Sequence, residues 1–141
     1  MSEDSLRWVN LSRVGKASYT LSNQRGGELT LGEGTGTDFT PVELLLGAIA
    51  GCSAIDVDYL TGKRAEPMSF RLHAEADKVR DADGNHLTNV KVTFDLRFPE
   101  GEDGDRARAA IPRAIEQSRD RLCTVSRTVQ LGTPVTMLQV D

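Results

Sequence analysis

The sequence predicts an α+β fold in which antiparallel strands wrap around one long, buried helix. Three observations lead to this prediction: an uncharged apolar run in residues 44–55, alternating apolar and polar residues within 70–98, and helical spacing of apolar residues after 105. Strands on both sides of the apolar run, with a second helix after them, give the element order of an α+β protein. With 141 residues, of which 38% are hydrophobic and 27% are charged, we expect a single domain spanning residues 1–141.

Three short strands are expected before the central helix. Each combines β-branched or large apolar residues with polar ones, and glycine-containing segments separate them. The second and third are joined by a hairpin turn at 23–27, where glycine supplies the positive φ that such turns need. The expected strands are residues 6–13, 17–21 and 28–31.

The central helix is predicted to run from Thr40 to Gly62. Thr40 can cap its start, Pro41 suits the first helical position, and Glu43 can close a capping box with Thr40. Residues 44–55 carry no charge, so the helix is apolar on every side and should be surrounded by protein. This uncharged run is too short to cross a bilayer, which takes about 20 residues.

A long antiparallel hairpin is expected after the central helix. In both arms every second residue is apolar, which gives each arm one buried and one solvated face. A turn at 82–85 joins the arms. The alternating apolar residues are Phe70, Leu72, Ala74 and Ala76 in the first arm, and Val90, Val92, Phe94, Leu96 and Phe98 in the second.

The last third of the chain predicts two helices and a strand. Apolar residues from Asp105 onward fall at helical spacing, up to a helix end at Cys123. Pro112 should kink this helix or split it in two, at about 3 kcal/mol if the turn cannot adapt. A short helix is expected over 124–131, and a final strand over 134–140.

Composition limits the classes of partner. The net charge of −4 argues against nucleic acid or an anionic membrane surface, because either would need a basic patch. The first residues contain two acids and no apolar core of a signal peptide, so we expect a cytoplasmic protein. The two cysteines fit neither a disulfide framework nor a metal-ligand spacing, and we expect no metal and no bound cofactor.

A second copy of the chain is the expected partner. Six strands with one apolar face each cannot wholly enclose a helix that is apolar on all sides. Part of that helix should therefore be covered by another subunit, and we predict an intertwined homodimer.

Two segments that contain the cysteines carry a family resemblance. The run PVELLLGAIAGCSAIDV, followed about seventy residues later by RLCTVSRTVQLGTPV, resembles the OsmC/Ohr family of osmotically induced and organic hydroperoxide resistance proteins. The resemblance covers nearly the whole chain. It implies two α+β subunits intertwined around two central helices, with Cys52 reducing peroxides and Cys123 assisting.

The chemistry implied by the resemblance is a thiol-dependent reduction of small organic hydroperoxides. A Cys52 thiolate would attack the O–O bond and become a sulfenic acid, and Cys123 would capture it as a disulfide that an external dithiol reduces. Cys123 lies at an expected helix N-terminus and could have the lower pKa of the two. Which thiol attacks first therefore stays open at this point.

The residues that would activate the thiol differ from the family pattern. The family places a glutamate directly after the helix-starting proline and an arginine in the preceding loop, whereas this chain has Val42 after the proline and no arginine in residues 32–38. Lys16 and Arg25 are the remaining candidate cations.

Two carboxylates are candidates for orienting the site. Asp56 lies four residues after Cys52 and so beside it on the helix, where its charge alone would disfavour a thiolate. Glu43 lies on the opposite side of the helix, and its capping-box role already accounts for it.

The departure from the family pattern keeps a second hypothesis open. In it the protein is a noncatalytic dimer of the same fold that binds a small lipophilic ligand in an apolar cleft. The two hypotheses differ in one measurable way, because only the peroxidase loses activity when Cys52 is replaced by serine.

Overall fold

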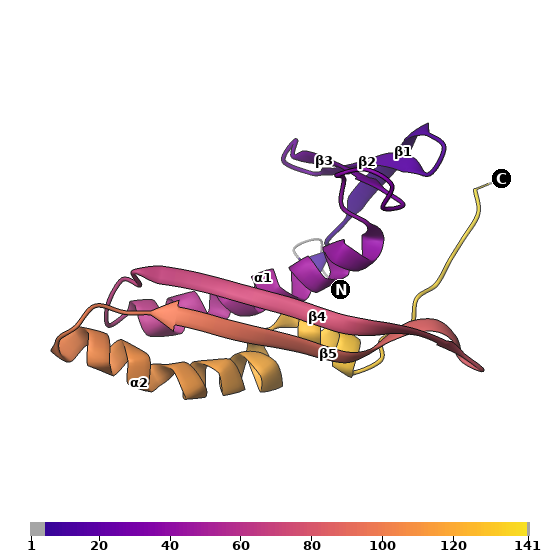
Figure 1. The fold of residues 1–141 in the computed structure, drawn as a ribbon. Helices are drawn as coiled ribbons and strands as arrows, with labels where there is room; N and C mark the ends of the chain where they lie inside the picture. The colour runs from indigo at the N-terminus through magenta and orange to yellow at the C-terminus, as the bar shows by residue number, and fades with distance from the viewer. Residues whose placement is uncertain (1–4, 141) are drawn as a thin grey trace. The chain divides into compact units, whose positions relative to one another are not determined.

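The computed structural model describes residues 5–140 of the chain. The chain forms two compact units, Met1–Leu45 and Leu46–Asp141. Both units contain antiparallel strands, and three α-helices follow or separate them (Figure 1). The predicted α+β class is confirmed.

The first unit contains a three-stranded antiparallel sheet in the order β1-β2-β3, and all three predicted strands are present. The turn between β2 and β3 is held by Asn23, whose Oδ1 accepts hydrogen bonds from the backbone N–H groups of Arg25 and Gly27 at 3.0 and 2.9 Å. Gly26 in this turn has a φ of 92°, which glycine adopts without strain. The strands are β1 (Val9–Gly15), β2 (Ser18–Asn23) and β3 (Glu28–Gly32).

The central helix α1 (Pro41–Gly62) begins as its sequence predicts. The Thr40 backbone N–H donates to Glu43 Oε1 at 2.8 Å, and the Glu43 backbone N–H donates to Thr40 Oγ1 at 3.2 Å. This reciprocal pair is the predicted capping box. The length and apolar composition of α1 would by themselves allow it to cross a membrane, a test that the core helix of a soluble protein also passes.

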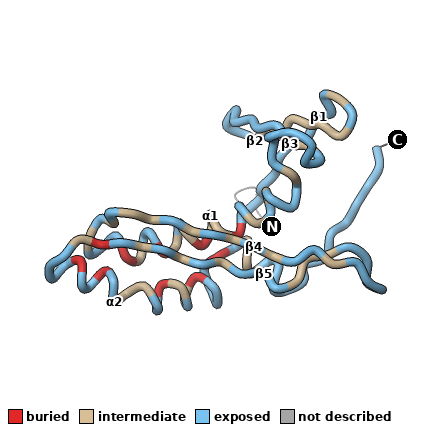
Figure 2. The backbone as a smooth tube through the Cα atoms, in the orientation of Figure 1, coloured by how far each residue is buried: buried red, intermediate tan, exposed pale blue. Residues whose placement is uncertain are grey.

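The expected burial of α1 on every side is not found in the single chain. Its buried residues form one stripe with a spacing of four, consisting of Ile49, Ser53, Val57 and Thr61. Ile55 and Tyr59, on other sides of the helix, are 59% and 74% exposed. The hairpin and helices of the second unit cover one side of α1, which is why the rest of its apolar surface stays open (Figure 2).

The long hairpin consists of β4 (Ser69–Asp81) and β5 (Gly84–Arg97), which pair antiparallel along their whole length. The predicted hairpin is confirmed, and its arms are longer than the alternating residues alone indicated. The register shifts between Glu75 and Asp77, a bulge of the kind that bends a strand and increases its twist.

Two α-helices and a π-helical turn follow the hairpin: α2 (Glu102–Gln117), η2 (Ser118–Leu122) and α3 (Thr124–Gln130). Both predicted helices are present, but α2 is not split at Pro112, which lies inside it. Pro112 is exposed, so water can bond the carbonyl of Arg108 that the proline leaves without a helical donor. The helix tolerates the proline for this reason.

The predicted strand over 134–140 is wrong. Within the described residues this segment forms no β-ladder, and Val135, Met137 and Leu138 are 80%, 89% and 91% exposed. The alternation of apolar residues is present in the sequence, but a strand also needs a neighbouring edge to which its backbone can bond. Within the described residues this segment pairs with neither of the two sheets.

The buried residues of the second unit lie on α1, at the end of the hairpin and on α2 (Figure 2). Small side chains on α2 and larger ones on α1 and after β5 form the core of this unit. The buried apolar residues of the core are Ile49, Val57, Phe98, Ala107, Ala114 and Cys123.

Candidate redox site

The fold brings the two cysteines together within the second unit. Cys52 projects from the middle of α1 and is half-buried, whereas Cys123 lies between η2 and α3 and is fully buried. The Cys52 thiol lies close enough to the Cys123 side chain and to the backbone of Thr124 and Val125 for all three to influence its pKa. Both thiols are free. Two sulfurs remote in sequence thus become neighbours at the start of α3.

Local backbone geometry places Cys123 at this position. The π-helical turn closes with a hydrogen bond from the Cys123 backbone N–H to the Ser118 carbonyl at 2.9 Å, and the chain then becomes extended at Cys123, with φ −74° and ψ 99°. The Cys123 sulfur accepts a hydrogen bond from the Ser126 backbone N–H at 3.4 Å. Cys123 is therefore the N-cap of α3, in agreement with the helix start predicted after it.

Opposing influences act on the ionisation of Cys52. Burial raises the pKa of the Cys52 thiol most, the backbone at Val125 lowers it, the Cys123 side chain raises it, and the backbone at Thr124 lowers it. The net result is a pKa above the ordinary cysteine value. A raised pKa means that the neutral thiol predominates near neutral pH, and the thiolate fraction grows as the pH rises.

We therefore expect the alkylation of Cys52 in the reduced protein to be slow at pH 7 and to accelerate with pH through a midpoint above that of an unperturbed cysteine. The rate is measured by mass spectrometry of the Cys52 peptide after timed exposure to iodoacetamide. In the Cys123→Ala variant the midpoint should move down, because the Cys123 side chain raises the pKa of Cys52. A midpoint below the ordinary value in the wild-type protein would contradict the assignment.

Three polar side chains, two of them buried, form a hydrogen-bond network next to Cys52 in α1. Ser118 Oγ donates to Asp56 Oδ2 at 2.9 Å, and the Ser53 and Ser118 hydroxyl oxygens are 2.9 Å apart. Ser118 is fully buried and Ser53 is 9% exposed. The sequence contained one signal for this hydrogen-bond network, since Ser118 is a polar residue on the apolar face of the predicted helix.

The remaining predicted site residues lie in the first unit. Lys16 is in the turn between β1 and β2, and Arg25 is in the turn between β2 and β3. Glu43 is engaged in the capping box with Thr40. The assignment of these residues to thiol activation stays a prediction, as does the orienting role of Asp56, whose carboxylate accepts from Ser118.

Among the residues that the structure describes, no group of three or more His, Cys, Asp or Glu side chains could hold a metal ion. The two histidines lie on the hairpin. His73 is 3.2 Å from Glu75, and His86 is 3.7 Å from Asp81.

A pocket of about 350 Å³ lies in the second unit and shares Ser53 and Ser126 with the surroundings of the cysteines. Its walls are mostly aliphatic and aromatic, and its polar groups come from α1, η2 and α3. The lining residues are Ile49, Ser53, Val90, Val92, Phe94, Ile115, Arg119, Ser126, Val129 and Gln130.

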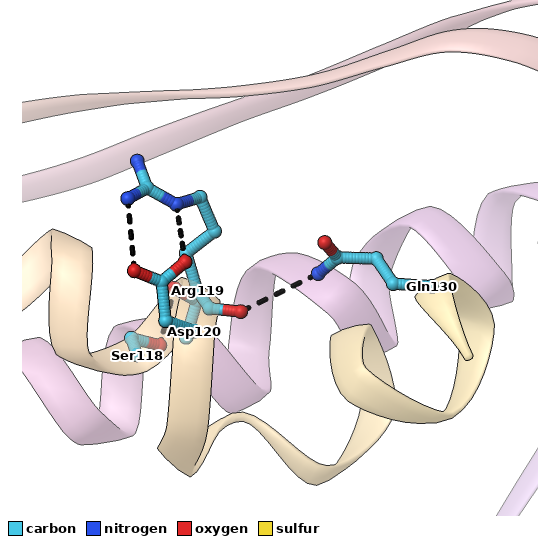
Figure 3. A network of polar contacts seen from close by, with 5 residues as sticks. Ser118, Arg119, Asp120 and Gln130 are labelled. Carbon is cyan, nitrogen blue, oxygen red and sulfur yellow. Dashed lines mark hydrogen bonds and ion pairs between the residues drawn. The ribbon is translucent and has the colours of Figure 1, made fainter.

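The basic group of this pocket is already paired. Arg119 donates from Nε to Asp120 Oδ1 at 2.8 Å and from Nη2 to Asp120 Oδ2 at 3.1 Å. Gln130 Nε2 donates to the Arg119 carbonyl at 3.4 Å, which ties α3 to η2 (Figure 3). The Asp120 carboxylate raises the pKa of Arg119, and Arg119 lowers that of Asp120, as expected for an ion pair.

Comparison with known proteins agrees with the fold. The family described as OsmC-like protein matches residues 34–137. Uncharacterized proteins of Mycobacterium tuberculosis and Mycobacterium bovis are 31% identical to this chain over 143 residues, covering 95% of each sequence.

Solved structures resemble the chain over most of its length. A hypothetical protein from Aquifex aeolicus superposes with a TM-score of 0.72 at 23% identity, covering 92% of this chain and 90% of that one. An OsmC-like protein of unknown function from Vibrio cholerae gives a TM-score of 0.75 at 12% identity, with coverages of 89% and 94%. Both likenesses concern the fold. The family match over residues 34–137 establishes that this chain belongs to the OsmC-like protein family.

Proposed function

We propose that this protein reduces organic hydroperoxides through the cysteine pair Cys52 and Cys123, as a defence against oxidative stress. The observation that carries the proposal is the proximity of the two side chains, one half-buried and one fully buried, at the start of α3. A half-buried thiol can meet a small substrate, and a buried neighbour can capture the oxidised product without diffusion.

The proposed reaction proceeds in three balanced steps. The Cys52 thiolate attacks one oxygen of R–O–O–H, the O–O bond breaks, and the alkoxide leaves and takes up a proton as the alcohol. Cys52 is then a sulfenic acid, which the Cys123 sulfur attacks to form a disulfide and release water. An external dithiol reduces that disulfide and becomes oxidised in turn, which restores both thiols. The reducing cytoplasm is the compartment that we propose for this cycle.

The raised pKa of Cys52 is the difficulty that an activating group would have to overcome. Backbone groups at Val125 and Thr124 already act in the favourable direction. We propose that Arg25 or Lys16 adds a cation, in which case Arg25→Gln or Lys16→Gln should move the alkylation midpoint of Cys52 to higher pH.

The experiment that tests the proposal is the oxidation of the reduced protein with one equivalent of cumene hydroperoxide. We expect the intact mass to fall by the two hydrogens of a new disulfide, and peptide mapping to join Cys52 to Cys123. A dithiol such as dihydrolipoamide should return the original mass. Oxidation to a stable sulfinic acid on Cys52, with no disulfide, would contradict the role of Cys123.

We also propose that the chain works as a homodimer. The apolar side of α1 that carries Ile55 and Tyr59 is exposed in the single chain, and so are the apolar residues of the segment 134–140. Apolar surface of this extent is typical of an interface. A second copy of this chain would bury both features, and it would give the unpaired segment an edge on which to form the strand that its alternation favours.

Light scattering after size-exclusion chromatography should give twice the chain mass of 15.4 kDa. Ile55→Asp should shift the protein toward the monomer, because it places a charge in the proposed interface. Asp58→Asn, an exchange at an exposed polar position of the same helix, should leave the dimer intact. A monomeric wild-type protein at micromolar concentration would refute the dimer.

A second candidate function is supported by the pocket beside Ser53. In it the protein is a noncatalytic dimer that binds a small lipophilic molecule, and the mostly apolar lining of about 350 Å³ is the observation in its favour. Equal and negligible turnover by the wild-type protein and by Cys52→Ser would select this function over the peroxidase.

A further inference from the structure

The pocket in the second unit has one polar group that is built into the core, the hydroxyl of Ser53. Ser53 is 9% exposed, lies on the buried stripe of α1 and lines the pocket. Its hydroxyl is 2.9 Å from the Ser118 hydroxyl, which lies 2.9 Å from Asp56 Oδ2. Which of these hydroxyl groups donates and which accepts decides what kind of ligand the pocket can recognise.

The carboxylate of Asp56 fixes these roles. An ionised carboxylate can only accept hydrogen bonds, so the single proton of the Ser118 hydroxyl is donated to Asp56. Ser118 then has no proton left for its other neighbour and accepts the proton of Ser53. With its own proton committed, Ser53 can offer the pocket only lone pairs. The polar anchor of the pocket is thus a hydrogen-bond acceptor.

The other polar groups of the pocket favour an uncharged ligand. Arg119 donates two hydrogen bonds to the Asp120 carboxylate, which compensates the charge of Arg119 and leaves little to attract an anion (Figure 3). Gln130 donates one of its two amide N–H groups to the Arg119 carbonyl, and its side-chain oxygen is another acceptor. The remainder of the lining is mostly aliphatic or aromatic.

We propose that this pocket binds a neutral aliphatic molecule that carries an O–H donor, with the O–H bonded to Ser53 Oγ and the hydrocarbon chain against the apolar walls. Alcohols and hydroperoxides share this chemistry. The inference deepens the second candidate function by naming the ligand class, and it concerns binding only, so it does not depend on any reaction of Cys52.

The test compares two probes of similar shape, 1-octanol and octyl methyl ether, by isothermal titration calorimetry with the full chain. Only the alcohol can donate to Ser53. We expect the wild-type protein to prefer the alcohol, and Ser53→Ala to reduce that preference by about fivefold while it still binds the ether, as expected for the loss of one hydrogen bond. An equal preference in both proteins would overturn the proposal.

Ser118→Ala tests the proton direction itself. In Ser118→Ala the Ser53 hydroxyl no longer donates to Ser118, so it can donate to a ligand in the pocket. Because the ether oxygen can accept this hydrogen bond, binding of the ether should strengthen relative to the alcohol. Thermal unfolding of each variant shows whether it is folded before its affinity is measured. An unchanged ratio of affinities in folded Ser118→Ala would contradict the proposed chain of donors.

A third variant identifies the site. Val129 lines the pocket and is 47% exposed, so Val129→Phe adds bulk there without disturbing the buried core. Both probes should bind at least about tenfold more weakly to it, since the added ring occupies the volume that the chain of the ligand needs. Undiminished binding would place the probes elsewhere. Octanoate should bind more weakly than 1-octanol, and a preference for octanoate would show an anion site instead.

Discussion

Cys52→Ser is expected to lower the dithiol-dependent consumption of an alkyl hydroperoxide by at least about a hundredfold, because the hydroxyl that replaces the thiol is not a nucleophile at neutral pH. The rate is measured as hydroperoxide remaining over time, with the protein in catalytic amount and dihydrolipoamide as reductant. The variant should fold normally, since serine is nearly isosteric with cysteine and Cys52 is only half-buried.

Cys123→Ser is the matched control for this prediction. Its Cys52 should still react with one equivalent of hydroperoxide, but the sulfenic acid should persist and react with dimedone, because no second thiol captures it. The opposite pattern, with activity retained in Cys52→Ser and lost at the first step in Cys123→Ser, would show that Cys123 attacks first. The pair of variants thus decides the question of order that the sequence left open.

Gly104→Ala is expected to destabilise the protein by about 3 kcal/mol, the upper end of the usual cost of adding a methyl group to a packed site. Gly104 is buried in the first turn of α2, and a Cβ atom there would collide with the backbone carbonyl of Pro99. Backbone cannot move aside as a flexible side chain would. Urea unfolding at fixed protein concentration measures the loss.

Asp103→Ala is the control, because it places an alanine at the neighbouring position in the same turn of α2. Asp103 is exposed, and its ion pair with Arg106 at 3.0 Å is a surface contact that we expect to contribute at most about 0.5 kcal/mol. Similar free energies of unfolding for the two variants would mean that the turn before α2 rearranges to admit a methyl group. The first turn of α2 matters for function because α2 carries Ile115 into the pocket.

The agreement between sequence and structure is best where the signal is local. The capping box of α1 involves Thr40 and Glu43, three residues apart, and the hairpin of β4 and β5 follows from alternation within each arm. The start of α3 at Cys123 likewise depends on neighbouring residues. Such signals are complete within one segment, so no knowledge of the remaining fold is needed to interpret them.

The failures have a common cause in surroundings that a single segment does not contain. Residues 134–140 alternate like a strand, but within the described chain they pair with no strand edge. Pro112 predicts a kink or a split in α2, and the helix is not split, because the exposed position of Pro112 allows water to satisfy the carbonyl that the proline leaves free. In both cases the outcome depends on what lies next to the segment in space.

The sequence by itself determined the fold class, the caps of the helices, and the two thiols as the groups to examine, because these depend on residue type and short-range spacing. Only the tertiary structure decided that Cys52 and Cys123 are neighbours and that Ser53, Ser118 and Asp56 form one chain of hydrogen bonds. Contacts between residues more than sixty positions apart are set by how α1 packs against η2 and α3. The donor and the acceptor of each of these hydrogen bonds follow from that packing and from the Asp56 carboxylate, which can only accept.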